Sequence, residues 1–306
     1  MMAVTVQDLV KNYTVKKKTI EALKGISFSV EKGEIFGIIG PDGAGKTSLF
    51  RILTTLLEPD GGSATVDGCS VKDEYLQIRQ RVGYMPGKFS LYQDLTVQEN
   101  LEFFAAIFNV SIADNYEYIK EIYEQIAPFK DRKAGQLSGG MKQKLALCCA
   151  LIHKPTVLFL DEPTTGVDAV SRKEFWEMLH RLKTQGITIL VSTPYMDEAG
   201  LCDRVGLIQK GAFLSIETPQ SIIRDFKKTL WSVRADDMYR LMETILKSPL
   251  INSCYPFGQY HHVTFKDDTK KQSDLEAIVA PGNFKDVEIA AIQPNIEDCF
   301  MALMTE

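Results

Sequence analysis

Hydrophobic and polar positions divide the first part of the chain into strands and a helix. Apolar and β-branched residues alternate with polar ones over residues 3–14 and 19–30, which predicts two strands, and Gly33 ends the second. The short apolar run 34–40 stops at a glycine-rich loop, and a helix is predicted over about 45–57, ended by the turn sequence Glu-Pro-Asp-Gly-Gly. A strand, a loop and a helix in this order are the building unit of an α/β fold.

The middle of the chain is predicted to be mainly helical before the apolar strands return. Residues 91–133 carry helical spacing, and Thr96 and Glu99 form a capping box. A further helix is predicted to start after Leu137.

Two continuous apolar runs, 156–163 and 187–193, have the pattern of buried parallel strands. Between them, Ser171 and Glu174 are predicted to cap a helix, and Gly186 stands where such a helix should stop.

The composition shifts near Thr218, after a predicted hairpin at 204–216. The remainder alternates between strand and helix patterns, with strands at 230–235, 251–257, 261–266 and 286–292 and helices at 238–248, 273–280 and 296–304. We therefore divide the chain into a main domain, 1–217, and a small α+β domain, 218–306.

The composition is that of an ordinary globular protein: 306 residues, 45% hydrophobic and 25% charged. The net charge of −5 lacks the basic surplus that nucleic-acid-binding proteins usually show. The six cysteines include no C-x-x-C pair, and adjacent Cys148 and Cys149 lie in an apolar helical pattern, so reduced thiols and a cytosolic location are expected. The four histidines lack metal-ligand spacing, and neighbouring His261 and His262 should point to opposite faces of a strand.

Neither a secretion signal nor a membrane span is predicted. The N-terminus has an early acid and no apolar stretch. The longest apolar segment, 145–160, is broken by His153, Lys154 and Pro155, and no run reaches the roughly 18 residues of a span. If the protein acts at a membrane, another chain must form the pore.

The strongest chemical signal fits the phosphate-loop pattern G-x-x-x-x-G-K-[ST] between an apolar strand and a helix, which is the context that this loop requires. Its residues are Gly40, Pro41, Asp42, Gly43, Ala44, Gly45, Lys46 and Thr47, and Ser48 follows. Glycines let successive N–H groups point at one anion, and the helix N-terminus adds its dipole. We predict that this segment binds ATP, with Lys46 on the β- and γ-phosphates and Thr47 as a ligand of Mg²⁺.

Two acids end the apolar run 156–163. Asp161 is predicted to hold the Mg²⁺ shell, and Glu162 to act as the general base that polarises the attacking water. A pair of solvated strand-end acids would be the alternative for the segment alone, but the phosphate loop upstream favours the catalytic interpretation.

A third motif, 137–147, places Ser138 at a helix start with Gly139 and Gly140 behind it, which makes a second anion site. A plain serine N-cap would have the same pattern. Its place between the phosphate loop and the acids resembles the signature motif of ATP-binding cassette (ABC) proteins, with Met141 where the common form has Gln. In that family the motif contacts the γ-phosphate bound to the opposite subunit, so the resemblance implies that ATP lies between two cassettes.

Residues 4 to about 215 resemble ABC ATPase domains throughout. The resemblance implies an α/β, P-loop NTPase fold with a mixed sheet core, an antiparallel β subdomain and a helical subdomain. It implies that Tyr13 stacks on adenine, although Tyr13 alone could be an ordinary strand-end residue. It also implies that Asp168 belongs to the D-loop, which runs along the dimer interface.

Segments 40–47, 84–101 and 192–199 most resemble bacterial export ATPases that work with ABC-2 type permeases, and 294–304 resembles the end of their accessory domain. This resemblance implies a second ATPase subunit, separate permease subunits, and a cytoplasmic location at the inner face of the cell membrane. Exposed side chains among Phe89, Leu91, Tyr92 and Leu95 are candidates for the permease contact, with core packing as the alternative for each.

Two other functional classes share a phosphate loop of this kind. A non-transport ABC ATPase that acts on ribosomes or DNA is the main alternative, but the chain has neither a basic face nor a long heptad run. A metabolic P-loop kinase is disfavoured, because a kinase needs no second phosphate site of the signature type.

Two positions depart from the family pattern. Gly87 stands where the Q-loop usually has Gln, and Pro194 stands where the switch His is usual. Loss of a positioned polar group commonly costs about 10²- to 10⁴-fold in rate. We therefore predict that this chain's own site binds ATP but hydrolyses it slowly, and that its signature motif completes the site of a different cassette in a heterodimer. A homodimer in which Glu162 and water suffice is the alternative.

Overall fold

The computed structural model describes residues 1–88 and 91–305, which form two compact units divided between Pro219 and Gln220. Each unit has its own core and is described separately. Within the described ranges, no helix combines the length and the apolar character needed to cross a bilayer.

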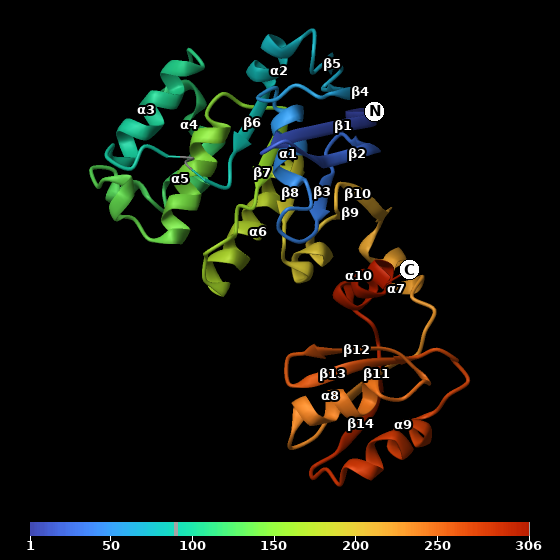
Figure 1. The fold of residues 1–306 in the computed structure, drawn as a ribbon. Coiled ribbons are helices and arrows are strands. Elements are labelled where there is room, and N and C mark those ends of the chain that lie inside the picture. Colours follow the sequence, from blue (N-terminus) through green and yellow to red (C-terminus); the bar gives the residue numbers. More distant parts are fainter. Residues whose placement is uncertain (89–90, 306) are drawn as a thin grey trace. The chain divides into compact units, whose positions relative to one another are not determined.

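A six-stranded mixed sheet forms the centre of the first unit, in the order β10-β9-β3-β8-β7-β6 (Figure 1). All neighbouring pairs are parallel except β9 and β10, which form the predicted hairpin. Strands β3, β7 and β8 are buried along their whole length, which explains their continuous apolar runs. The six strands are β3 (Ile35–Ile39), β6 (Val82–Met85), β7 (Val157–Asp161), β8 (Thr188–Thr193), β9 (Arg204–Gln209) and β10 (Ala212–Glu217).

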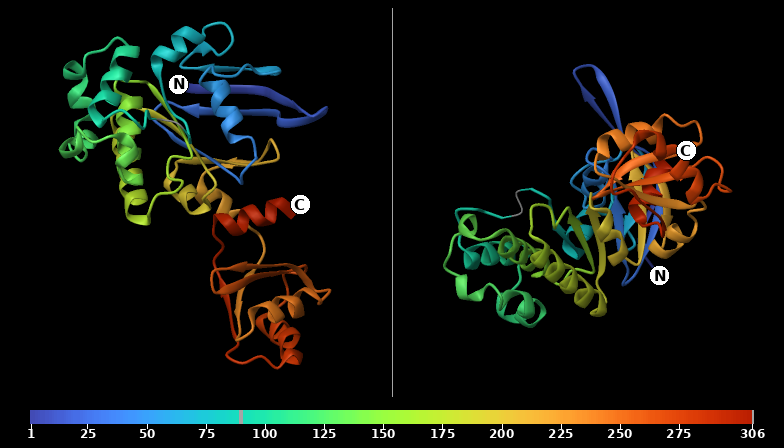
Figure 2. Two further views of the ribbon diagram at one scale, coloured as in Figure 1. Left: turned by 60° about the vertical axis from the view of Figure 1, so that its left-hand side comes forward. Right: turned by 90° about the horizontal axis from the view of Figure 1, so that it is seen from below.

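A second, antiparallel sheet has the order β2-β1-β4-β5. Its strands are β1 (Met2–Val15), β2 (Lys18–Glu31), β4 (Gly61–Val66) and β5 (Cys69–Ser70). The long β1–β2 hairpin extends beyond the other strands of its sheet (Figure 2). The predicted antiparallel subdomain is therefore present.

Helix α1 packs with both sheets in one apolar core, where the rings of Phe50 and Phe159 form a T-shaped pair with centroids 5.6 Å apart. Helices α3, α4 and α5 gather on one side of this unit and form the predicted helical subdomain (Figure 1). The helices are α1 (Lys46–Leu53), α2 (Tyr75–Arg81), α3 (Val97–Ile107), α4 (Ile112–Tyr123), α5 (Gly139–Leu151) and α6 (Ala169–Thr184), with short 3₁₀ turns η1 (Ala127–Phe129), η2 (Ala134–Gln136) and η3 (Met196–Leu201).

Two predicted helix boundaries were wrong. Helix α1 ends at Leu53 and not near Leu57, because Thr55 takes a left-handed backbone (φ 62°). Helix α6 begins before Ser171, with Asp168 as its N-cap: the carboxylate accepts hydrogen bonds from the N–H groups of Val170 and Ser171. The capping box of Thr96 and Glu99 is confirmed.

The second unit is built on an antiparallel sheet in the order β12-β13-β11-β14. Apolar side chains of this sheet pack with α8 and α9 on one face. His261 bonds the carbonyl of Met238 in α8, whereas His262 bonds Asp298 of α10, so the two histidines face opposite sides as predicted. The elements are α7 (Pro219–Arg224), β11 (Leu230–Arg234), α8 (Met238–Leu246), β12 (Ile251–Phe257), β13 (Tyr260–Phe265), α9 (Gln272–Val279), η4 (Ala280–Gly282), β14 (Glu288–Ile292) and α10 (Ile296–Thr305).

Candidate functional site

The loop between β3 and α1 depends on its glycines, because a side chain at these positions would force the backbone to shift. A Cβ at Gly40 would overlap the carbonyl oxygen of Ile208, and one at Gly45 would overlap that of Ala22. Gly43 and Gly45 also have left-handed backbones, with φ of 78° and 108°. The loop therefore curls tightly onto the N-terminus of α1, where free N–H groups and the helix dipole favour an anion.

Lys46, the first residue of α1, lies inside this loop and is only 3% exposed. Its ammonium donates to the carbonyl oxygens of Gly40 at 2.8 Å and Pro41 at 3.1 Å. It also pairs with Glu162 Oε1 at 3.3 Å. The first turn continues with Thr47 and Ser48.

The two predicted acids lie where the chain leaves β7. Asp161 is the last residue of that strand and is 2% exposed, and Glu162 follows with a left-handed backbone (φ 52°). The hydroxyl of Ser192 donates to Asp161 Oδ1 at 2.5 Å. Burial, and next the Asp161 carboxylate, raise the pKa of Tyr84 to about 12, so this phenol stays protonated.

A cavity of about 410 Å³ joins these groups. Its wall includes Gly43–Ser48 and Glu162, together with residues that the sequence did not single out: Ile20, Glu21, Ala22, Lys24 and Lys210. The β9–β10 turn reaches the loop because Gly211 N donates to Ala44 O at 3.0 Å, and Lys24 N donates to Gly211 O at 2.8 Å. Three lysines, Lys24, Lys46 and Lys210, and two glutamates, Glu21 and Glu162, line the cavity, so cationic groups outnumber anionic ones, which suits a polyanion.

The donor chemistry fits Mg²⁺. A threonine hydroxyl at Thr47 and a carboxylate at Asp161 are hard oxygen ligands, and Mg²⁺ typically takes one or two such protein ligands beside phosphate oxygens and water. Across the described ranges no cluster of three or more His, Cys, Asp or Glu side chains could hold a metal by itself.

Tyr13 lies beside the loop: its hydroxyl is 3.1 Å from Ser48 Oγ. The ammonium of Lys11 lies 5.9 Å from the centroid of the Tyr13 ring. The ring is thus placed at the first turn of α1.

The signature segment forms a separate surface. Ser138 is the N-cap of α5, and its Oγ accepts from Met141 N at 3.3 Å. A Cβ at Gly140 would lie 2.7 Å from Ser171 Oγ, so the starts of α5 and α6 lie against each other. Among the described residues, neither Ser138–Gly140 nor Asp168 belongs to the cavity wall.

The two unusual positions border the acids and the loop. A Cβ at Gly87 would lie 2.9 Å from the carbonyl oxygen of Asp161. Pro194 follows Thr193, whose carbonyl accepts from Gly40 N at 3.3 Å. Neither position carries a polar side chain that could meet a phosphate or a water.

Of the four candidates for permease contact, Leu91 is buried at 8% exposure and Leu95 is half-buried, whereas Tyr92 is 51% exposed. Phe89 lies outside the described residues. Tyr92 contacts the ring of Phe103 in α3, with centroids 4.5 Å apart.

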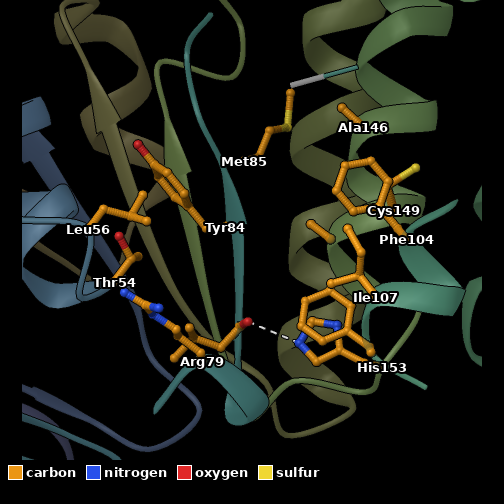
Figure 3. Close-up of a pocket in the computed structure, with 13 residues that line it drawn as sticks. Thr54, Leu56, Arg79, Tyr84, Met85, Phe104, Ile107, Ala146, Cys149 and His153 are labelled. Carbon is orange, nitrogen blue, oxygen red and sulfur yellow. Dashed lines mark hydrogen bonds between the residues drawn. The ribbon is translucent and has the colours of Figure 1, made fainter. Parts of the chain in front are cut away.

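A second cavity of about 330 Å³ lies beside β6 and is also lined by residues of α3 and α5 (Figure 3). Its lining includes Tyr84 and Met85 of β6, Leu56 after α1, and Phe104 and Ile107 of α3. His153 also lines this cavity: its Nε2 forms a hydrogen bond with the carbonyl of Val82 at 2.9 Å, and burial lowers its pKa. The wall is therefore mostly apolar and neutral, with Arg79 as the charged exception.

Comparison with known proteins agrees with this geometry. Residues 23–165 match the family model described as ABC transporter. The chain is 37% identical over 287 residues to the probable multidrug ABC transporter ATP-binding protein YbhF of Escherichia coli, covering 92% of the chain and 49% of YbhF. It is also 37% identical over 212 residues to the ABC transporter ATP-binding protein NatA of Bacillus subtilis, covering 68% of the chain and 86% of NatA. The chain thus spans about half the length of YbhF.

Solved structures give the same result for the fold. An ATP-binding subunit of an ABC transporter superposes with a TM-score of 0.65 at 27% identity, covering 73% of this chain and 93% of that one. The MJ0796 cassette, solved as a dimer bound to ADP and Pi, superposes with a TM-score of 0.64 at 26% identity, covering 70% of this chain and 98% of the cassette. The predicted ABC ATPase fold is confirmed. With relatives of this identity and coverage, the chain belongs to the family of ABC transporter ATP-binding proteins.

Proposed function

We propose that the chain is the ATP-binding and ATP-hydrolysing subunit of a membrane exporter whose transmembrane segments lie on separate permease subunits. The observation that carries this proposal is the single cavity that joins the glycine loop, Lys46 and Glu162. Relatives named for multidrug transport, Nod factor export and linearmycin resistance favour export over an action on ribosomes or DNA. The proposed location is cytoplasmic, at the inner face of the cell membrane.

In the proposed reaction, loop N–H groups and Lys46 bind the phosphates of ATP, and Tyr13 stacks on the adenine. Thr47 and Asp161 would hold Mg²⁺, which neutralises charge on the β- and γ-phosphates when bound. Glu162 accepts a proton from the attacking water. In the structure, the Lys46 ammonium pairs with Glu162 Oε1 at 3.3 Å. When the Lys46 side chain turns to the phosphates instead, the Glu162 carboxylate becomes free to accept the proton.

The position of the signature segment supports a two-cassette arrangement. Ser138, Gly139 and Gly140 stand at a helix N-terminus apart from the chain's own cavity, so their phosphate would be bound to another cassette. ATP would hold the two cassettes together, and loss of the γ-phosphate would let them part.

The missing polar groups at Gly87 and Pro194 support a slow site within this arrangement. We propose that the chain binds ATP tightly but turns it over slowly, and that it pairs with a different cassette whose own Q-loop and switch residues are intact. A homodimer that relies on Glu162 and water is the competing arrangement.

The cavity in Figure 3 supports a docking place for the permease. The cavity lies between the helical subdomain and β6. A permease segment bound there would therefore be displaced by any movement of one against the other. Ile107 at its rim is 58% exposed, and the apolar wall suits a short apolar segment of the permease.

The test is the steady-state, Mg²⁺-dependent ATPase activity of the purified chain beside a nucleotide-binding assay, with Lys46→Ala and Glu162→Gln as variants. Tight binding with almost no turnover supports the slow site and a second cassette subunit. A turnover rate per chain that rises with protein concentration, and that is lost in both variants, would indicate a competent homodimer. Failure of the wild-type chain to bind nucleotide would overturn the proposed function.

A further inference from the structure

One hydroxyl group contacts both acids of the site. Ser192 is fully buried in β8, beside Asp161 in the parallel register of β7 and β8. Its Oγ donates to Asp161 Oδ1 at 2.5 Å and accepts from the backbone N–H of Glu162 at 3.1 Å. A serine hydroxyl can donate and accept at the same time, so a single side chain satisfies both contacts.

The first contact fixes the carboxylate of Asp161. Among the described residues, this carboxylate accepts its hydrogen bond through Oδ1, which leaves Oδ2 for the Mg²⁺ shell. An apolar side chain at 192 would remove the hydroxyl that holds Oδ1 and would free the carboxylate to rotate. Partners that orient a metal ligand in this way commonly change metal affinity about 10- to 100-fold when they are removed.

The second contact fixes the backbone of Glu162. Its N–H is held by both the carbonyl oxygen of Ser192, at 3.0 Å, and the Ser192 hydroxyl. A left-handed backbone is unusual for a residue with a side chain, and such conformations persist only where the surroundings hold them. Ser192 therefore supports the backbone conformation of Glu162, whose side chain lines the cavity.

We propose that Ser192 is a positioning residue that sets the metal affinity of the ATP site by orienting Asp161, and that it keeps Glu162 aligned for the water. This inference rests on the proposed function, since it assumes that the site binds Mg²⁺ and nucleotide. It matters more here than at a complete site, because Gly87 and Pro194 contribute no side-chain hydrogen bond.

The experiment measures metal binding instead of turnover. The wild-type chain and Ser192→Ala are saturated with ADP in metal-free buffer, and Mn²⁺ is then titrated as a spectroscopic substitute for Mg²⁺, with bound metal followed by electron paramagnetic resonance. We expect Ser192→Ala to bind ADP as tightly as wild type without metal, and to weaken Mn²⁺ binding about tenfold or more. Ser192→Thr, which keeps the hydroxyl, should restore most of the Mn²⁺ affinity.

Thr188→Val is the matched control, because it removes another buried hydroxyl of β8, one that accepts from Gly33 N at the far end of the strand. It should leave Mn²⁺ affinity unchanged. In an Asp161→Asn background, Ser192→Ala should have no further effect on metal binding, since it acts through Asp161; this comparison stands even if Ser192→Ala lowers stability.

Equal Mn²⁺ affinity in Ser192→Ala and wild type would overturn the inference while leaving ATP binding intact. An equal loss of Mn²⁺ affinity in Thr188→Val would also overturn it, because the loss would then come from a less stable β8 and not from the contact with Asp161. A wild-type chain that binds no ADP would instead overturn the proposed function, and this inference with it.

Discussion

At the scale of single residues, the site combines a strained backbone with two missing side chains. Glu162 keeps a left-handed conformation that typically costs about 1–3 kcal/mol, and it does so beside a glycine at position 87 that approaches β7 closely. The two departures from the family pattern therefore differ in kind. At Pro194, which follows the end of β8, the change removes a polar side chain. At Gly87, the absence of a side chain also allows the backbone to pack closely against Asp161.

Pro194→His should raise turnover, because it returns a polar side chain to the residue after β8, next to the carbonyl that bonds Gly40. We expect kcat to rise about tenfold or more, with little change in nucleotide affinity. The measurement is steady-state ATPase activity beside nucleotide binding, and Pro194→Ala controls for the loss of the ring. An unchanged kcat would mean that Pro194 does not limit the reaction.

Gly87→Gln should not restore activity in the same way. Its Cβ would lie 2.9 Å from the carbonyl oxygen of Asp161, which forces the segment or β7 to move. Overpacking of this kind typically costs about 1–3 kcal/mol of stability. Urea denaturation should show the loss in both Gly87→Gln and Gly87→Ala, because both add the Cβ. A stable Gly87→Gln chain with faster turnover would contradict this expectation.

At the scale of elements, the start of α6 connects stability to the proposed interface. The Asp168 carboxylate caps the helix, and hydrogen bonds from the backbone and hydroxyl of Ser171 hold its pKa below the ordinary value. A carboxyl whose pKa is lowered by folding stabilises the protein above its unfolded pKa, near pH 4, and this contribution is lost as the pH falls through the folded pKa.

Asp168→Ala should therefore lower the Tm at neutral pH, and the difference from wild type should shrink as the pH approaches about 3. Thermal unfolding followed by circular dichroism at several pH values measures it. Glu177→Ala, an exposed acid in the middle of the same helix, separates the capping effect from the general loss of a negative charge. A Tm difference that stays constant across this range would argue against a capping carboxylate.

The elements also show what sequence patterns can and cannot predict. Strands β3, β7 and β8 and the glycine loop followed from continuous apolar runs and a specific motif, because burial on both faces leaves a clear signature. The N-cap of α6 was misplaced, since Asp168 and Ser171 can both cap a helix and only the backbone decides. Lys24 and Lys210 gave no signal: Lys24 lies within the long strand β2 and Lys210 in the β9–β10 turn, neither belongs to a motif, and both reach the cavity through hydrogen bonds of Gly211.

At the scale of the whole molecule, the central question is what completes the ATP site. The chain's phosphate cavity contains no signature residue of its own among the described residues, and its signature segment presents Ser138 elsewhere. In one copy of the chain, the phosphate cavity and the signature segment therefore do not meet at a single nucleotide. In the proposed two-cassette arrangement, either a second copy of this chain or a different cassette would provide the other half.

Glu162→Gln distinguishes these arrangements, because it slows hydrolysis while it leaves the loop and Lys46 free to bind ATP. If the chain pairs with a different cassette, as proposed, Glu162→Gln saturated with ATP should remain a monomer by light scattering at micromolar concentration. If copies of the chain pair with each other, ATP should convert this variant to a dimer, and adding Ser138→Arg, which blocks the helix N-terminus of α5, should return it to a monomer. A dimer that survives Ser138→Arg would mean that the copies associate through another surface, which would remove the reason for placing Ser138 at a second nucleotide.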